Sequence, residues 1–238
     1  MAMNREKAAN STEITKPLTQ LRIQEAAVRL FAAKGFEGTG IREIADQAGV
    51  QTSALYHYMD SKEDLLVDIM VSILGRLIAS AKSALVGATN PQAQLIALVR
   101  AHVGLHAFAR LSAIVGDGEL RALGEASRAQ VVGLRDEYED LWAVVLSGGR
   151  AEKLFDFDDE KITRLALLEM CNGVSHWYSD SGSLPVEDVA DAFAELALSL
   201  VGATTGGRRV RLSDVDGPSA KEVLAIVRRI LESDLATA

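Results

Sequence analysis

The sequence feature that most constrains the fold is the stretch IREIADQAGVQTSALYHYM, residues 41–59. Apolar residues recur at helical spacing in its first half, and Gly49 then stands where a helix C-cap needs a residue that tolerates a positive φ. A second short helix is predicted from about Thr52, with a polar outer face. Its inward positions are expected to be Ala54, Leu55 and Met59. A helix this short is unstable alone in water, so the chain must hold it rigid, as in a DNA-reading helix-turn-helix.

The flanking sequence supplies a support for this motif. Residues 18–34 have the apolar periodicity of an amphipathic helix, which Gly35 ends. Thr39 is placed to cap the helix at residue 41, and its hydroxyl with the free backbone N–H groups would bind a phosphate. Lys62 begins the next helix, where a cation opposes the helix dipole, so it indicates a phosphate nearby.

Core, turn and phosphate-contact positions within residues 23–66 share one consistent spacing. These positions are Ala26, Phe31, Gly35, Phe36, Thr39, Ile44, Ala45, Ala48, Gly49, Val50, Leu55, Tyr56, Tyr58, Lys62 and Leu65. The pattern resembles the DNA-binding domain of the tetracycline-repressor (TetR) family. Two positions depart from that family: Gly40 replaces the usual Thr or Ser and removes one phosphate contact, and Met59 replaces the usual Phe as an apolar plug.

A few placed side chains, rather than a broad positive field, are expected to bind double-stranded DNA. Residues 1–65 hold eight basic against nine acidic residues, in a chain whose net charge is −8. The expected phosphate contacts are Thr39, Arg42, Tyr58 and Lys62, and the expected major-groove contacts are Thr52, Ser53 and Tyr56 with their neighbours Gln51 and His57.

The remaining sequence predicts further helices, over residues 62–86, 93–115, 125–146, 162–177, 186–201 and 220–235. We find no strand pair with hairpin chemistry, although RVRL in the linker can extend briefly. The predicted fold is all-α: an N-terminal three-helix DNA-binding domain, a C-terminal helical ligand-binding and dimerisation domain, and an extra C-terminal helix. The predicted divisions are a mobile arm (1–17), the helix-turn-helix domain (18–64), the effector and dimerisation domain (65–202), and a linker with the added helix (203–238).

Composition narrows the setting in which such a chain works. Its single cysteine, Cys171, excludes an internal disulfide framework and fits a reducing cytosol. The first residues lack the apolar run of a signal peptide, and nowhere do eighteen apolar residues follow one another without charge. We therefore expect a cytoplasmic protein without a membrane partner.

The resemblance implies a homodimer whose second domain binds a small-molecule effector. By that resemblance, helices at about 160–178 and 186–201 would pair with their copies. The expected interface residues are Ala166, Met170, Gly173, Ala190, Phe193, Ala194, Ala197 and Leu198. Asn172-Gly173 followed by aromatic residues resembles a subgroup that controls fatty-acid or steroid breakdown, whose effectors are CoA thioesters. The alternative is that Trp177 and Tyr178 simply pack at a helix end.

Candidate pocket residues are His102, His106, Trp142, Asn172, His176 and Trp177. His102 and His106 lie four apart on one helical face, but no further ligand accompanies them in register, so we expect neither metal nor cofactor. Cys171 and His176 would point in different directions and lack an orienting group, so no catalytic residue is predicted.

The predicted function is transcriptional repression by a homodimer on a palindromic operator, from which the effector, lipid-like or an acyl-CoA, releases it. A transcriptional activator with the same head is the first alternative, and the sequence does not separate the two. An all-helical enzyme with an appended DNA-binding head is the second, and it would need a catalytic constellation that we do not find.

Overall fold

The computed structural model describes the backbone of residues 3–237 and the side chains of residues 18–233. The first half of the chain forms α1 (Met3–Lys34), α2 (Ile41–Ala48), α3 (Thr52–Leu55), α4 (Lys62–Leu85), α5 (Pro91–Phe108), α6 (Arg110–Gly118) and the short 3₁₀ helix η1 (Glu119–Ala122). The second half forms α7 (Glu125–Ala151), α8 (Glu160–Asn172), α9 (Val174–Trp177), α10 (Val186–Leu200), β1 (Thr204–Thr205), β2 (Arg208–Arg209), η2 (Leu212–Asp214) and α11 (Ala220–Thr237). The predicted all-α fold is confirmed, apart from the small β1–β2 pair.

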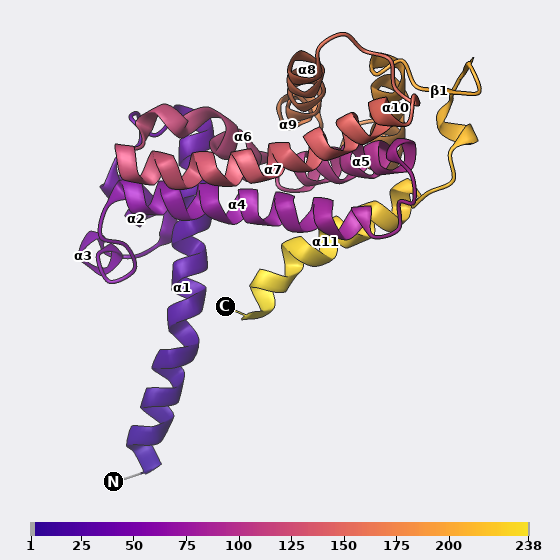
Figure 1. The fold of residues 1–238 in the computed structure, drawn as a ribbon. Helices are drawn as coiled ribbons and strands as arrows, with labels where there is room; N and C mark the ends of the chain where they lie inside the picture. Colours follow the sequence, from indigo (N-terminus) through magenta and orange to yellow (C-terminus); the bar gives the residue numbers. More distant parts are fainter. Residues whose placement is uncertain (1–2, 238) are drawn as a thin grey trace.

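The N-terminal head packs around one apolar core at one end of the molecule (Figure 1). That core joins α1, α2 and α3 to the first half of α4, and includes Phe31, Ile44, Leu55 and Leu66. The α1 helix begins at Met3 rather than at residue 18, and Pro17 does not end it. Ala, Glu and Lys in this stretch favour a helix, although a proline inside a helix removes one backbone donor and its ring crowds the carbonyl four residues earlier. The mobility predicted for residues 1–17 remains a prediction.

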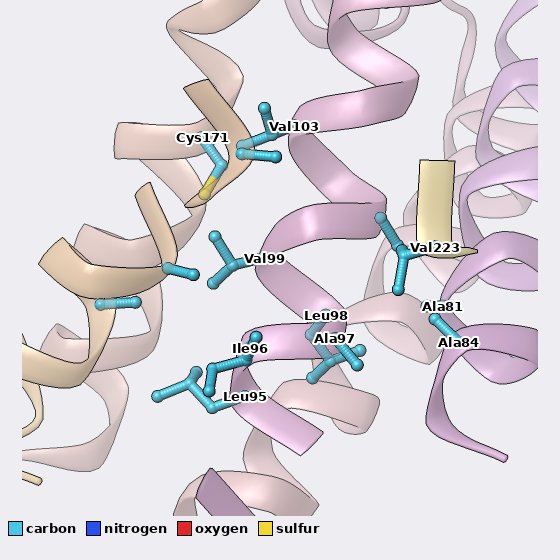
Figure 2. Packing of buried hydrophobic residues seen from close by; sticks show 14 of the residues in the cluster. Ala81, Ala84, Leu95, Ile96, Ala97, Leu98, Val99, Val103, Cys171 and Val223 are labelled. Carbon is cyan, nitrogen blue, oxygen red and sulfur yellow. The ribbon is translucent and has the colours of Figure 1, made fainter. Parts of the chain in front are cut away.

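The second core is built around α5, whose residues are buried on nearly every side. Helices α4, α7, α8, α10 and α11 pack against it. In Figure 2, Val99 and Val103 of α5 face Cys171 of α8, whereas Val223 of α11 lies on the opposite side of α5. The apolar pattern of α5 therefore has no single stripe, as expected for a helix at the centre of a domain.

A bend between α5 and α6 was not predicted. The helix expected over 93–115 ends at Phe108, and α6 leaves at 104° to α5 and continues through the glycines at 116 and 118. No Gly or Pro marks the break at Ala109, so tertiary packing rather than local propensity sets it. No single helix in the described residues is long and apolar enough to cross a membrane, and only this bent pair meets the criteria of length and composition together.

The linker after α10 contains a two-residue hairpin, which corrects our expectation of no hairpin. Thr204 pairs with Arg209 and Thr205 with Arg208 in antiparallel register. Gly206 and Gly207 both have positive φ, 59° and 77°, as a type I′ turn requires. The Gly-Gly signal was therefore present in the sequence, between strands too short to show alternation.

The added C-terminal segment is fastened to the second domain by polar side chains. Arg100, buried on α5, donates from Nε to Asp191 of α10 at 2.8 Å and from a guanidinium nitrogen to the Pro218 carbonyl at 2.6 Å. Gln92 donates to the Thr204 carbonyl at 3.0 Å. Val223, Leu224 and Val227 of α11 are buried against α5 and α4. The expected apolar stripe of this helix therefore packs on its own domain.

Candidate nucleic-acid interface and ligand cavity

The turn between α2 and α3 is fixed by backbone and side-chain bonds. Gly49 has φ +67°, and its N–H donates to Asp46 at 3.1 Å while the N–H of Val50 donates to Ala45 at 3.0 Å. The Arg22 guanidinium, from α1, donates to the Ala48 carbonyl. The predicted C-cap at Gly49 is confirmed. These hydrogen bonds fix the turn that connects α2 to α3.

Helix α3 presents polar side chains outward, as the sequence indicated. Leu55 is fully buried and Met59 nearly so, whereas Tyr56 is 56% exposed. Gln51, Ser53 and His57 are exposed, and Thr52 and Tyr58 are half-buried. Ala54 is also half-buried rather than inward as predicted, because α3 spans one turn and only one of its residues reaches the core. The open face is thus available to a groove of DNA.

Thr39 does not cap α2. The N-cap is Gly40, without a side-chain bond, and Thr39 is 2% exposed with its hydroxyl donating to the Gly35 carbonyl at 2.8 Å. The hydroxyl closes the end of α1 instead, because the loop folds back over that helix terminus. The phosphate contact expected of Thr39 remains a prediction.

Lys62 is held by the same loop. Its ammonium donates to the carbonyls of Phe36 at 2.8 Å and Thr39 at 3.0 Å, so it has a role inside the protein that the sequence did not indicate. Arg42 is exposed on α2, beside this loop in the sequence. The DNA contacts of these residues remain predictions.

A cavity of about 300 Å³ opens in the second domain between α4, α5, α6, α7 and α8. Three predicted pocket residues line it, namely His102, Asn172 and His176. Its other walls combine apolar residues with charges, among them Leu74, Leu77, Asp117, Arg135, Tyr138, Glu139, Leu165, Leu168 and Glu169. Four leucines together with convergent polar and charged groups make this cavity a candidate small-molecule site.

His102 is the centre of the polar groups at the cavity. Its Nε2 lies 2.9 Å from Asn172 Oδ1 and its Nδ1 lies 2.9 Å from the Tyr138 hydroxyl. Because the amide oxygen only accepts, Nε2 carries the proton and Nδ1 accepts from Tyr138. Burial, and then the neighbouring His106, lowers the pKa of His102 well below its usual value, so the ring is neutral. Burial also raises the pKa of Tyr138.

The other three predicted pocket residues lie outside the lining. His106 stacks on His102 at 4.1 Å between ring centroids, and its Nδ1 donates to the His102 carbonyl at 3.0 Å. Trp142 is fully buried, with its ring at 80° to that of His102. Trp177 is 50% exposed and stacks on Phe193 of α10 at 6.1 Å. His106 and Trp142 thus pack against the lining residue His102 without lining the cavity themselves. Trp177 is the last residue of α9.

The predicted pairing face on α8 and α10 is only partly available. Ala190, Ala194, Ala197 and Leu198 are buried in the protomer's own core, whereas Ala166 is exposed and Met170, Gly173 and Phe193 are half-buried. Large apolar side chains that we did not predict are exposed instead: Ile162, Leu165, Leu196 and Leu200. Their spacing of three or four residues along each helix was visible in the sequence, but it could not be told from core spacing.

Two chemistries considered from sequence find little support in the side chains. Among residues 18–233, no three His, Cys, Asp or Glu side chains are grouped to hold a metal ion. Cys171 is buried, which raises the pKa of its thiol.

A helix-turn-helix on an all-helical domain that has a cavity of mixed polar and apolar lining is the arrangement of a DNA-binding regulator. Comparison with known families agrees. Residues 23–69 match the family described as bacterial regulatory proteins, tetR family, and residues 88–201 match the tetracyclin repressor-like C-terminal domain. Both matches end before the added segment that carries α11.

Similar proteins support the same assignment. The repressor KstR2 of Rhodococcus jostii is 28% identical over 176 residues, which cover 73% of this chain and 86% of that protein. A tetR-family regulatory protein from Rhodococcus RHA1 has 30% identity and a TM-score of 0.72, over 79% of this chain and 98% of its own. AibR, solved with isovaleryl coenzyme A and operator DNA, has 26% identity and a TM-score of 0.68, over 75% and 97%. The chain belongs to the TetR family, and it is a DNA-binding transcriptional regulator.

Proposed function

We propose that the protein is a homodimeric transcriptional repressor that reads a palindromic operator through α3 and is released by a ligand in the α4–α8 cavity. The main observation in favour of DNA reading is that α3 exposes polar side chains while it packs on the apolar core of the head. Because one turn of helix reads few bases, two copies one DNA turn apart supply the selectivity. Similarity to KstR2, named as a repressor, favours repression over activation.

The second copy is proposed to pack on α8 and α10. Ile162 is 63% exposed and Leu196 is 53% exposed, so each protomer has apolar residues in solvent on these two helices. Self-association through such a patch follows the two-fold logic of most homodimers.

For the effector, we propose an acyl thioester of the CoA class, in lipid or steroid breakdown. AibR is described in complex with isovaleryl coenzyme A, which supports the CoA class. KstR2 of Mycobacterium tuberculosis is described as a ketosteroid transcriptional regulator, which supports a role in steroid breakdown. The cavity, at about 300 Å³, suits an acyl group rather than a whole CoA. Glu139 and Glu169 in the cavity wall would repel the phosphates of CoA, so we expect these phosphates to lie outside the cavity. We propose no catalysis at this site, because His102 is fixed on both nitrogens.

Selection from a random duplex library tests the DNA half of this proposal. We expect enrichment of a palindrome whose half-sites lie one turn apart. Thermal-shift screening with isovaleryl-CoA, palmitoyl-CoA, free CoA and the free acids tests the ligand half. Stabilisation by an acyl-CoA, with weaker operator binding, is expected. Recovery of no preferred sequence would overturn the first half, and stabilisation by none of these ligands the second.

A further inference from the structure

A second cavity, which we call the junction cavity, lies where the head meets the second domain. It has a volume of about 390 Å³, and its walls come from α1, α4, the bend between α5 and α6, and α11. Val28 and Ile69 in these walls pack with the apolar core of the head, whereas Ile73 belongs to the core of the second domain. Ligand sites of about 300–1,000 Å³ are common at such domain interfaces.

The junction cavity is separate from the α4–α8 cavity, since the two have no lining residue in common. Helix α4 contributes to both through different faces. Ile69, Ile73 and Arg76, which are three or four residues apart, line the junction cavity, whereas Leu74 and Leu77 line the α4–α8 cavity. Residues at that spacing share one face of a helix. The junction cavity is therefore a candidate site of its own.

One wall of the junction cavity comes from the added C-terminal helix, which runs beside α4 (Figure 1). Leu231 of α11 lines the cavity. One turn earlier, the Arg228 guanidinium lies 4.2 Å from the centroid of the Phe108 ring, and Phe108 lines the cavity too. The family match to the second domain ends at residue 201. This chain therefore completes the cavity with a segment that lies outside the matched domains.

Apolar side chains from all four walls line the junction cavity. They include Leu21, Val28, Ile69, Ile73, Leu111 and Leu231. Leu21, Leu111 and Leu231 are only half-buried, so an apolar ligand would remove further hydrocarbon surface from water. The lining thus favours a ligand with an apolar body.

The charged groups at the junction cavity favour an anion. Arg29 and Arg76 line it against one carboxylate, that of Glu25. Arg29 and Glu25 lie 3.7 Å apart on one turn of α1, and both side chains are more than half exposed. An exposed pair of this kind contributes little free energy, so Arg29 can instead bind an anionic group of a ligand. The lining therefore carries an excess of positive charge, in a chain whose net charge is −8.

We propose that the junction cavity binds a small anionic amphiphile, whose hydrocarbon body packs on the apolar walls and whose carboxylate is bound by Arg29 and Arg76. A guanidinium matches a carboxylate in shape and charge, because two parallel N–H donors face its two oxygens. This site is additional to the proposed function. It needs neither the operator nor a ligand in the α4–α8 cavity, so its failure would leave the repressor proposal standing.

Methyl NMR of the full-length protein, titrated with decanoate, tests the site directly. The methyl signals of Leu21, Ile73 and Leu231 should shift in a saturable way, with one decanoate bound per protomer at this site. Leu74 and Leu77 report the α4–α8 cavity in the same spectra. Shifts confined to Leu74 and Leu77 would place decanoate in that cavity and overturn the proposal.

Comparison with other ligands tests the class of ligand. Decanol and decyltrimethylammonium have the same chain length but a neutral or cationic end. Each should bind at least about tenfold more weakly than decanoate, the size of one lost hydrogen bond to a charged group. Equal affinity for decanol would overturn the role of the anion. If dilution of the ligand-free protein shifts the same methyl signals and decanoate does not, a second copy of the chain covers this face and the proposal is wrong.

The two arginines are tested by substitution. Arg29→Gln and Arg76→Gln should each weaken decanoate binding by about five- to tenfold, because each removes a charged donor for the carboxylate. Arg128→Gln is the matched control and should keep the wild-type affinity, because Arg128 is exposed on α7 and does not line the cavity. Wild-type affinity in both cavity variants, or an equal loss in the control, would overturn the proposal.

Leu231→Ala tests the contribution of α11. It shortens an apolar wall and should weaken decanoate binding by about three- to tenfold. If amide signals along α11 show that the helix has loosened, Ser112→Phe replaces this variant. A ring at this half-buried lining position fills the cavity and should abolish saturable binding. Wild-type decanoate affinity in Leu231→Ala, or in Ser112→Phe where it is used instead, would overturn the proposed site.

Discussion

Lys62 donates to the carbonyl of Phe36 at 2.8 Å and places its ammonium 4.0 Å from the centroid of the ring of the same residue. It also reaches the Thr39 carbonyl at 3.0 Å. A lysine in the first turn of α4, where the helix dipole disfavours a cation, therefore fastens the loop that leads into α2. An ammonium has three donors, so one remains to face a phosphate.

Replacing Lys62 by alanine is expected to weaken binding to specific and unrelated duplexes alike. The salt dependence of binding should flatten by about one counterion, because one phosphate contact is lost. The loop should also loosen, at a cost of about 1–3 kcal/mol in the free energy of unfolding. Fluorescence anisotropy across a salt titration and urea denaturation measure the two effects.

Lys82→Ala is the matched control, since Lys82 pairs with Glu137 on the surface of the second domain. An unchanged salt slope in the Lys62 variant would contradict its phosphate contact. An unchanged free energy of unfolding would contradict its role in holding the loop.

Tyr56 on α3 offers a test of whether α3 recognises the base sequence of the operator. Because it is 56% exposed, Tyr56→Ala should leave the free energy of unfolding within about 0.5 kcal/mol of wild type. Binding to the selected operator should fall by about 1–3 kcal/mol, with little change on unrelated DNA. Competition binding against both duplexes measures this difference. Equal losses on both would mean that Tyr56 contacts the backbone.

The proposed pairing of α8 and α10 is tested at Leu196. Leu196→Arg places a charge in the apolar patch and should convert the dimer to a monomer, because burying an unpaired guanidinium costs several kcal/mol. Sedimentation and operator binding should change together, since a single head reads only one half-site. Val86→Arg is the control: Val86 is 88% exposed at the end of α4, outside α8 and α10. A dimeric Leu196 variant would place the interface elsewhere.

Local features of the head were predictable because local sequence determines them. The periodicity of α2, the left-handed Gly49 and the polar positions of α3 can each be recognised within a few residues of sequence. The roles of Thr39 and Lys62 were not predictable in the same way. Both depend on the loop after α1 folding back over its end and meeting α4, 23 residues further along the chain for the Thr39–Lys62 pair.

In the cavity, too, some features could be predicted from the sequence and others depend on contacts between distant residues. Six residues were predicted from chemistry and spacing, and His102, Asn172 and His176 line it together. The bond between His102 and Asn172 joins positions 70 residues apart, and the bend at Ala109 that brings Asp117 to the wall carries no Gly or Pro signal. The hydrogen bonds of Arg135 to the Gly116 and Asp117 carbonyls depend on that bend, so local patterns could not predict them.

Helix α11 is expected to contribute strongly to stability. Leu224 is 2% exposed, and its Cδ2 would lie 2.5 Å from a Cβ placed on Gly104 of α5, so the two helices pack without a gap. Leu224→Ala should lower the free energy of unfolding by about 2–5 kcal/mol through a cavity. Lys221→Ala, exposed on the same helix, should change it by less than about 0.5 kcal/mol. Equal, small effects in urea denaturation would mean that α11 is only loosely attached.

The neutral His102 predicts a pH dependence of stability. Its pKa is lowered in the folded protein, first by burial and then by His106, against an opposing hydrogen bond from Asn172. As pH falls below about 6.5, the unfolded chain therefore binds a proton that the folded protein does not. Below about pH 6.5, the free energy of unfolding should therefore fall by up to about 1.4 kcal/mol per pH unit. Above that pH, the neutral His102 causes no such loss.

His102→Gln removes the titrating ring but can still hydrogen-bond, so its stability should depend less steeply on pH between about 6.5 and 5. His106, Asp117 and Tyr138, which face the site, are left in place in this variant. His57→Gln, which replaces an exposed histidine outside the cavity, is the matched control. A wild-type slope in His102→Gln would mean that another group takes up the proton on unfolding.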